Sequence, residues 1–186
     1  MMIYGLVAAA LALLVGVIWL YNLLVHKWQM VNNGWADIDV QLKRRSDLVP
    51  RLVDVVRAYA AHERTLFEDI AEKRSLALIA GEDPVRRAEA EGALSAPVTQ
   101  LLALAEAYPD LKASLNFADL QSELVDTENQ IEMARRFYNG AVRELNTAVQ
   151  SFPANLVAPV IGFSPRDYFE IRSADREAPQ VRLGPT

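Results

Sequence analysis

Few side chains in this sequence are suited to acid–base, metal or nucleophilic chemistry. The chain of 186 residues has no cysteine and two histidines, His26 and His62. Glu63 follows His62, but the next residues are Arg-Thr-Leu, so no second histidine returns to the same helix face as a zinc-protease motif requires. A di-iron bundle needs a glutamate three residues before the histidine, and that position is Tyr59. We therefore expect no metal, no cofactor and no catalytic residue, and we interpret His62 as a helix residue that hydrogen-bonds across the helices or is half-exposed.

Nucleophilic and carboxylate chemistry also lack a motif. The sequence has no G-x-S-x-G and no glycine-rich phosphate loop after a strand. Asp37 and Asp39 are two residues apart, so on a helix they point to different faces. The sequence therefore predicts a protein that is not an enzyme. A hydrolase or ligand-binding domain of an unfamiliar kind is an alternative without a supporting group of residues, and substitution of His62 and Glu63 would test it.

The segment from Lys43 to Asp47 is the group of charges best suited to recognition. A straight helix would put it about 25 Å beyond Lys27, too far from lipid headgroups for a strong attraction at physiological salt. One interpretation is a polar turn in which Arg45 pairs with a carboxylate of another helix. The other is that Arg44, Arg45 and Asp47 contact a partner protein or a neighbouring protomer.

An uncharged N-terminal segment, residues 1–25, precedes all of these groups. Its apolar run from Ile3 approaches the roughly 20 residues that a helix needs to cross the hydrocarbon core of a membrane. The segment has neither the basic N-terminal region nor the small-residue cleavage site of a signal peptide. This favours a retained transmembrane anchor over a removed signal peptide. Lys27 and the basic residues after it favour a cytoplasmic body by the positive-inside rule. We expect one membrane span, with the lipid bilayer as a partner.

The body beyond the anchor contains all 24 acidic and 19 basic residues of the chain, so its net charge is −5. Its length of about 160 residues suits one domain with a hydrophobic core. Duplex binding usually needs a concentrated basic face, so this mildly acidic body is not expected to bind nucleic acid.

Helical periodicity predicts two helices in the first half of the body. One continues out of the anchor to a boundary near Ser46 and Asp47, where Asp47 is suited to an N-cap and Pro50 to a first helical turn. The next spans about 48–80, with an apolar face that includes Phe67. Both predictions rest on apolar residues spaced three and four apart.

Two further helices are expected in the second half. Asp83 caps one that runs to about Ala107, with a kink at Pro97. The last spans about 117–152 and keeps a strict spacing of three and four, which indicates packing of helix on helix. Gly140 within it weakens a helix by about 1 kcal/mol relative to alanine, so a close packing contact is expected there.

These elements predict an all-α fold: a transmembrane helix (1–25), then an antiparallel four-helix bundle with long helices (26–152). The predicted lengths do not match, because the first extramembrane helix is much shorter than the second and fourth. The alternative is therefore a three-helix body in which Pro50 only kinks one continuous first helix.

An extended, proline-rich tail (153–186) completes the chain, with five of its nine prolines. Phe163, Tyr168 and Phe169 would be poorly placed in water. We expect the tail to lie on the bundle or on a neighbouring protomer to about residue 171, and these three aromatic residues are candidates for the contact.

Several stretches together resemble the LemA family of bacterial single-pass membrane proteins. They are Tyr21-Asn22, residues 35–50, Tyr59 to Glu63, Arg136 to Asn139, Phe152-Pro153 and residues 161–169. Where the family often has a second Tyr-Asn, this chain has Leu145-Asn146. The resemblance implies an N-terminal anchor, a bundle of long helices inside the cell and a place in the bacterial inner membrane. One branch resembles components of magnetosome membranes, which favours a role in membrane organisation.

We expect a non-enzymatic, membrane-anchored helical protein that self-associates or scaffolds other proteins at the bacterial inner membrane. A homo-oligomer, a membrane-protein partner or both are expected. The alternative is a regulatory adaptor for a membrane protease or transporter. An adaptor would be monomeric until its client is present, whereas a scaffold would assemble alone.

Overall fold

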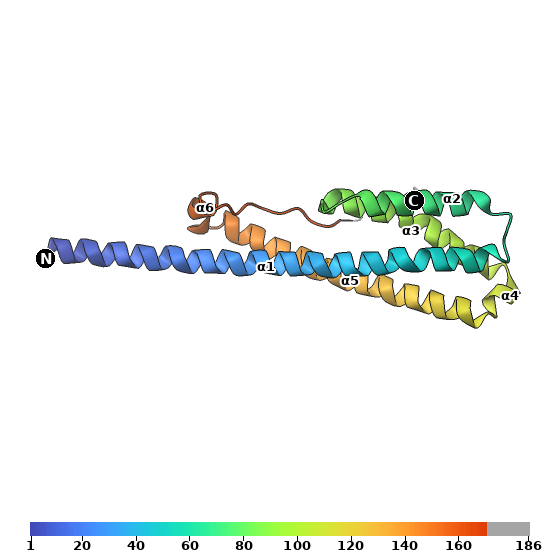
Figure 1. The fold of residues 1–186 in the computed structure, drawn as a ribbon. Coiled ribbons are helices and arrows are strands. Elements are labelled where there is room, and N and C mark those ends of the chain that lie inside the picture. The colour runs from blue at the N-terminus through green and yellow to red at the C-terminus, as the bar shows by residue number, and fades with distance from the viewer. Residues whose placement is uncertain (171–186) are drawn as a thin grey trace, which may run out of the picture.

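The computed structural model describes residues 1–170, and this part of the chain is all-α, with no strand. The all-α prediction is confirmed. The predicted tail after residue 170 lies outside the described residues. Figure 1 shows an elongated molecule in which one long helix reaches beyond the other elements at its N-terminal end.

The long helix is α1 (Met2–Arg57), a single helix of 56 residues. An 18-residue window within it has a mean hydropathy of 2.5 and is 6% buried, so by length and composition α1 could cross a membrane. The predicted continuity between the apolar segment and the first seam of the body is confirmed, because no break separates them.

The helix boundary predicted near Ser46 and Asp47 is wrong, and the alternative that α1 continues through Pro50 is correct. An internal proline costs about 3 kcal/mol. The same turn and the next bury Val49, Leu52, Val53 and Val56, each contributing about 1.5–3 kcal/mol. Burial along this face therefore outweighs the cost of the proline, and the helix is not interrupted.

A break occurs instead where one helix was predicted over 48–80. The chain leaves α1 at Arg57, turns over residues 58–63, and continues as α2 (Arg64–Ile79). His62 lies exposed in this turn and not in a helix. The reversal lets Phe67 and Ile70 of α2 join the buried cluster around Val56, so tertiary burial explains a turn that has no glycine or proline to mark it.

The second half of the chain is closer to prediction. α3 (Pro84–Glu106) begins at Asp83, whose Oδ1 accepts hydrogen bonds from the backbone N–H groups of Val85 at 2.9 Å and Arg86 at 3.1 Å. α4 (Pro109–Lys112) is a short turn, and α5 (Leu115–Gln150) is the predicted 36-residue helix, two residues earlier in the chain. α6 (Ala154–Val157) opens the tail, and a cis peptide bond joins Phe152 to Pro153.

The body is built from an antiparallel pair, α1 and α5, with the α2–α3 hairpin packed beside the half of α1 that is distant from the N-terminus (Figure 1). Two buried clusters follow this arrangement. One joins α1, α2, α3 and α5 around Leu52 and Leu101, and the other joins α1, α5 and the tail around Ile38 and Tyr138.

The close helix contact expected at Gly140 is not there, because a Cβ atom added to that residue would meet nothing within 4 Å. The contact lies at Gly34 of α1. A Cβ there would be 3.0 Å from both Cδ1 of Phe137 and Cα of Tyr138. Gly34 therefore lets the backbones of α1 and α5 approach each other near the middle of the molecule.

Candidate functional site

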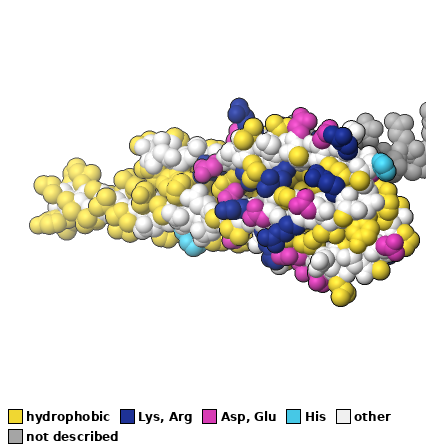
Figure 2. Space-filling view, turned by 45° about the vertical axis from the view of Figure 1, so that its right-hand side comes forward, with side chains coloured by type: hydrophobic (Ala, Val, Ile, Leu, Met, Phe, Trp, Pro, Cys, Tyr) yellow, Lys and Arg dark blue, Asp and Glu magenta, His cyan; other side chains and the backbone are white. Residues whose placement is uncertain are grey.

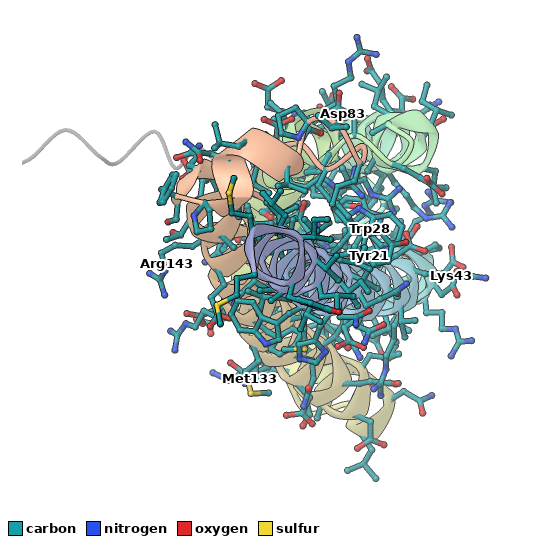
Figure 3. The ribbon with its side chains drawn as sticks, turned by 90° about the vertical axis from the view of Figure 1, so that its left-hand side faces the viewer. Tyr21, Trp28, Lys43, Asp83, Met133 and Arg143 are labelled. Atoms are coloured by element: carbon teal, nitrogen blue, oxygen red, sulfur yellow. The ribbon has the colours of Figure 1, made fainter. Side chains whose placement is uncertain are left out.

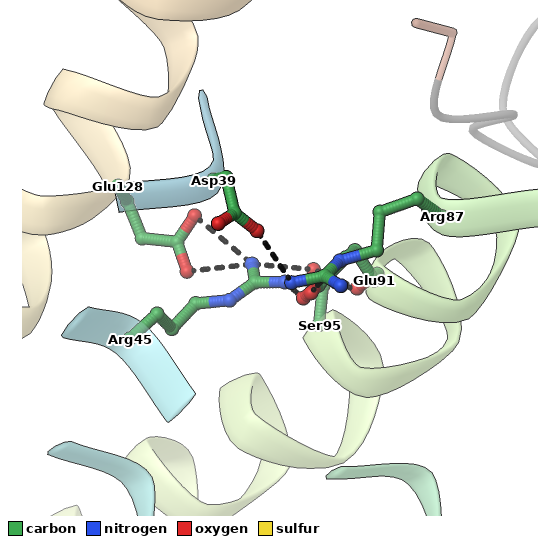
Figure 4. Close-up of polar contacts among 6 residues, drawn as sticks. All are labelled: Asp39, Arg45, Arg87, Glu91, Ser95 and Glu128. Carbon is green, nitrogen blue, oxygen red and sulfur yellow. Dashed lines mark hydrogen bonds and ion pairs between the residues drawn. The ribbon is translucent and has the colours of Figure 1, made fainter. Parts of the chain in front are cut away.

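A buried ionic network lies at the centre of the body, and Figure 4 shows its members. The side chain of Arg45 is 1% exposed. Its Nη1 donates to Oε1 of Glu128 at 3.0 Å, and its Nη2 donates to the carboxylate of Glu91 and, at 3.2 Å, to the Glu91 carbonyl oxygen. Arg45 thus binds a carboxylate from α3 and one from α5 at the same time.

Arg87 extends this network back to α1. Its Nε donates to Oε1 of Glu91 at 3.1 Å, and its Nη2 lies 3.4 Å from Oδ1 of Asp39. Glu91 is therefore shared by two guanidinium groups, and its side chain is 3% exposed. The network links α1, α3 and α5 at one level of the molecule.

The electrostatics keep Arg45 charged. Burial lowers the pKa of the guanidinium, but the charges of Glu128 and Glu91 and their hydrogen bonds raise the pKa by more, so it lies above its usual value. Nε of Arg45 and Oγ of neighbouring Ser46 are buried and have no hydrogen-bond partner among the described residues. Such an arrangement fixes helix positions, because a buried charge is tolerated only where its partners are in place.

The candidate residues near the distal half of α1 do not lie together. Arg45 points into the body and pairs with carboxylates of other helices, as one of the two interpretations expected. Arg44 lies on the surface, where its Nη2 is 3.0 Å from Oε1 of Glu123, and Asp47 is exposed. Only Arg44 and Asp47 are therefore presented to solvent.

The carboxylates of this network were not predicted from the sequence. Glu91 follows Ala88 by three residues and precedes Ser95 by four, so it occupies a seam position on α3 as Arg45 does on α1. One charged residue in each of two apolar seams is a signal for a buried pair. It could have been recognised, although the sequence alone does not show which helices face each other.

The tail aromatics have different environments. Phe169 is fully buried, and its ring centroid lies 6.0 Å from that of Trp35, which in turn is 5.6 Å from that of Tyr138. Tyr168 is exposed, and Phe163 is half-buried with its ring centroid 6.2 Å from that of Tyr21. The tail up to Glu170 therefore lies against the same chain, next to α5 and α1.

Two asparagines of α5 hold the tail backbone. Oδ1 of Asn139 accepts from the N–H of Phe169 at 2.9 Å, and its Nδ2 donates to the carbonyl of Phe169 at 3.1 Å. Asn146 makes the same pair of hydrogen bonds to Arg166, at 2.8 and 2.9 Å. Because these asparagines are seven residues apart, they share one helix face and grip the extended tail at two points.

Tyr138 adds a third contact, since its Oη donates to the carbonyl oxygen of Asp167 at 2.9 Å. The pKa of this phenol is raised to about 12, chiefly by burial, with a smaller lowering by the charge of Arg166 and a smaller rise from the charge of Asp167. Tyr138 therefore stays a neutral donor over the physiological range.

Two further features bear on ligand binding. A cavity of about 300 Å³ lies between α1, the α2–α3 turn, α5 and the tail, and its lining includes Asn32, Tyr138 and Arg166. Nη2 of Arg166 lies 3.3 Å from Oδ1 of Asn32, so this cation already has a partner. Within residues 1–170, no three histidine, aspartate or glutamate side chains are grouped so as to hold a metal ion.

These features define an all-α protein in which an apolar N-terminal helix continues into a body held by a buried ionic network and a docked tail. The chain belongs to the LemA family, whose family model matches residues 34–183. The predicted resemblance is therefore confirmed.

Individual relatives share about a quarter of their aligned residues with this chain. The chain is 24% identical over 179 residues to magnetosome protein MamQ of Magnetospirillum gryphiswaldense, and equally to magnetosome protein MamQ 2 of Paramagnetospirillum magneticum. Each alignment covers 83% of this chain and 66% of the relative. Protein LemA of Metamycoplasma hominis is 26% identical over 137 residues, which cover 74% of this chain and 63% of that protein. The chain thus spans somewhat less than two thirds of the length of each of these relatives.

Proposed function

We propose that this chain is a non-enzymatic membrane protein whose N-terminal span holds a helical body in a fixed orientation at the bacterial inner membrane. There the body self-associates or scaffolds other proteins. The observation that carries the proposal is the continuity of α1 from Met2 to Arg57. At 1.5 Å per residue such a helix is about 84 Å long, so it extends from the proposed bilayer to the far end of the body.

The interior contacts support a rigid connection. The Arg45 network ties α1 to α3 and α5, and the close approach at Gly34 ties α1 to α5 a further three turns toward the span. A body joined in this way cannot swing freely about its anchor. This property suits a protein that presents a surface to neighbours within the plane of a membrane.

The relatives extend the proposal to membrane organisation. MamQ is named a magnetosome protein, and this likeness supports a role of the present chain in membrane organisation. The basic residues after the span support a cytoplasmic body under the positive-inside rule.

The candidate surface for self-association is a strip on α5. Val125 and Met133 are half-exposed and lie on one side of this helix, and Met133 points away from the other helices in Figure 3. Apolar side chains exposed in this way are typical of protein contacts when they gather on one face. We expect two copies to meet along this strip.

The experiment is light scattering of the full chain in detergent, with crosslinking in native membranes. The native chain should be larger than a monomer, and the pair Val125→Glu and Met133→Glu should reduce it to a monomer. The control pair is Leu76→Glu and Leu78→Glu on α2, which are similarly exposed and should leave the assembly unchanged.

The same experiment distinguishes a self-associating scaffold from the alternative, a regulatory adaptor for another membrane protein. A native chain that is monomeric in detergent and crosslinks only to a different membrane protein would favour an adaptor. A chain that is monomeric in membranes and co-purifies with nothing would contradict both functions.

A further inference from the structure

The charges of the molecule stop at one level on both long helices. Lys27 is the first lysine or arginine of α1, and its Nζ lies 3.1 Å from Oε2 of Glu144, the last charged residue of α5. Beyond this pair, residues 1–25 and residues 145–165 carry no charged side chain. Figure 2 shows the result: charged side chains cover the body and are absent from its narrow end.

The segment 152–163, which includes α6, lies at this uncharged end. Figure 1 places α6 beside α1, close to where the apolar run of α1 ends. Contacts agree with the view, since Phe163 meets Tyr21 and Ala158 belongs to the same buried cluster as Leu24. The apolar surface of the segment is therefore continuous with that of the proposed span.

The segment has its large apolar side chains outside and its small ones inside. Ala154 and Ala158 are buried against the helices. Phe152, Leu156 and Val160 recur every four residues and are 80, 66 and 85% exposed. This arrangement is unfavourable in water, where large apolar side chains gain most from burial.

We propose that segment 152–163 is a second membrane contact, which inserts Phe152, Leu156 and Val160 into the surface of the bilayer that α1 crosses. This inference rests on the proposed membrane span. Interfacial segments of this kind lie about 5–10 Å into the boundary between headgroups and acyl chains. A lipid surface is the occupant that fits, because the segment is level with the end of the apolar run and continuous with its surface.

The contact is apolar and does not select for headgroup charge. No charged residue lies between Leu145 and Pro165, and the nearby Lys27 is already paired with Glu144. A neutral lipid surface is thus sufficient. Two attachment points would also limit how far the body can tilt relative to the bilayer.

The test uses the absence of cysteine from the chain. Single variants Leu156→Cys and Val160→Cys are made in the full chain, labelled with an environment-sensitive fluorophore and reconstituted in phosphatidylcholine vesicles. A parallel set of vesicles carries bromine on the acyl chains, which quenches probes that touch them. Val15→Cys in the apolar run and Leu76→Cys on α2, which is exposed and outside the candidate self-association strip, are the controls.

Probes at 156 and 160 should lose fluorescence in brominated vesicles as the probe at 15 does, while the probe at 76 should not. Quenching at 15 without quenching at 156 and 160 would overturn the second contact and leave the proposed span intact. A blue-shifted but unquenched emission at 156 that grows with protein concentration would also overturn it, in favour of a second copy. Lack of quenching at 15 would refute the span and, with it, this inference.

Discussion

Arg45 illustrates how one residue can decide the position of three helices. Its side chain is buried between Glu91 of α3 and Glu128 of α5, so its removal leaves Glu91 buried with fewer partners. We expect Arg45→Met to lower the free energy of unfolding by about 3–5 kcal/mol, the usual cost of breaking a buried pair. Chemical denaturation of the full chain in detergent, followed by circular dichroism, measures this change.

The matched control is Arg44→Met. Arg44 makes an ion pair of similar length with Glu123, but the two side chains are 49% and 40% exposed. Its substitution should cost about 0–1 kcal/mol. Equal effects of the two arginine substitutions would contradict the structural role of the network.

Two glycines in the α1–α5 pair should respond oppositely to the same substitution. Gly34→Ala puts a Cβ 3.0 Å from the backbone of Tyr138, so we expect a net loss of about 1–3 kcal/mol even though alanine favours a helix. Gly140→Ala meets no neighbour and should gain about 0.5–1 kcal/mol. Thermal unfolding of both variants tests the pair, and stabilisation by Gly34→Ala would show that the helices are not in close contact.

Because of Tyr138, docking of the tail should weaken at strongly alkaline pH. Its pKa is about 12 in the folded chain and 10.0 in the reference state, so folding favours the protonated phenol. The stabilisation is complete below pH 10.0 and is lost as the pH rises through about 12, because the phenolate cannot donate to Asp167. The ultraviolet difference spectrum between the native chain and Tyr138→Phe should therefore show a phenol that ionises near pH 12 and not near pH 10.0.

The same substitution separates hydrogen bonding from packing. Tyr138→Phe keeps the ring beside Trp35 and removes one hydrogen bond, which should cost about 1 kcal/mol at neutral pH. Ionisation of Tyr138 at its ordinary pKa would mean that the tail does not cover it.

At the scale of elements, Pro50 and Arg74 form a unit that docks α2 on α1. Pro50 has no N–H, so the carbonyl oxygen of Ser46 lacks its usual helical donor. Nε of Arg74 donates to this oxygen at 2.6 Å. The proline thus leaves a free acceptor near the C-terminal end of α1, and Arg74 of α2 satisfies it.

A double-mutant cycle tests this unit. Arg74→Met should cost about 1–2 kcal/mol in the native background, because it leaves a buried carbonyl without a donor. In the Pro50→Ala background the new N–H of residue 50 can bond to Ser46, so the cost of Arg74→Met should be smaller. Equal costs in the two backgrounds, measured by denaturation, would show that the two residues act independently.

Sequence patterns predicted those elements whose signals are local. α5 was recognised from its unbroken seam, and the start of α3 from the Asp83 cap and the proline after it. The turn at 58–63 was not predicted, and the passage of α1 through Pro50 was only the alternative prediction, because each depends on what α2 buries when it folds back. Pro50 did not end the helix that contains it, whereas the turn at 58–63 ends a helix without a glycine or proline.

The candidate site divides in the same way. The polar seam position of Arg45 was visible in the sequence, but its partners come from residues 46 and 83 positions away. Asn139 and Asn146 share a helix face by spacing alone, yet nothing in the sequence shows that a tail would return to them. Long-range pairing was therefore the missing information.

At the scale of the whole molecule, the proposal requires α1 to transmit the orientation of the span to the body. A flexible Gly-Ser-Gly insertion between Val25 and His26 would separate the span from the body and leave the buried face of α1 from Val31 onward unchanged. The unfolding temperature of the body should then stay the same, while polarised infrared spectroscopy in oriented bilayers should show a smaller dichroism of the helical amide bands. An alanine insertion of the same length keeps the helix and should keep most of the dichroism.

Combining the flexible insertion with Leu156→Ser and Val160→Ser distinguishes attachment through the span from attachment through segment 152–163. If segment 152–163 also holds the body at the bilayer, the flexible insertion alone should reduce the dichroism only in part, and the combined variant should leave only the contribution of the span. The helices of the body run close to the axis of α1, so loss of a fixed orientation has a large effect on the signal (Figure 1). Full dichroism in the combined variant would show that neither attachment orients the body, and that an oligomer or another protein does so instead.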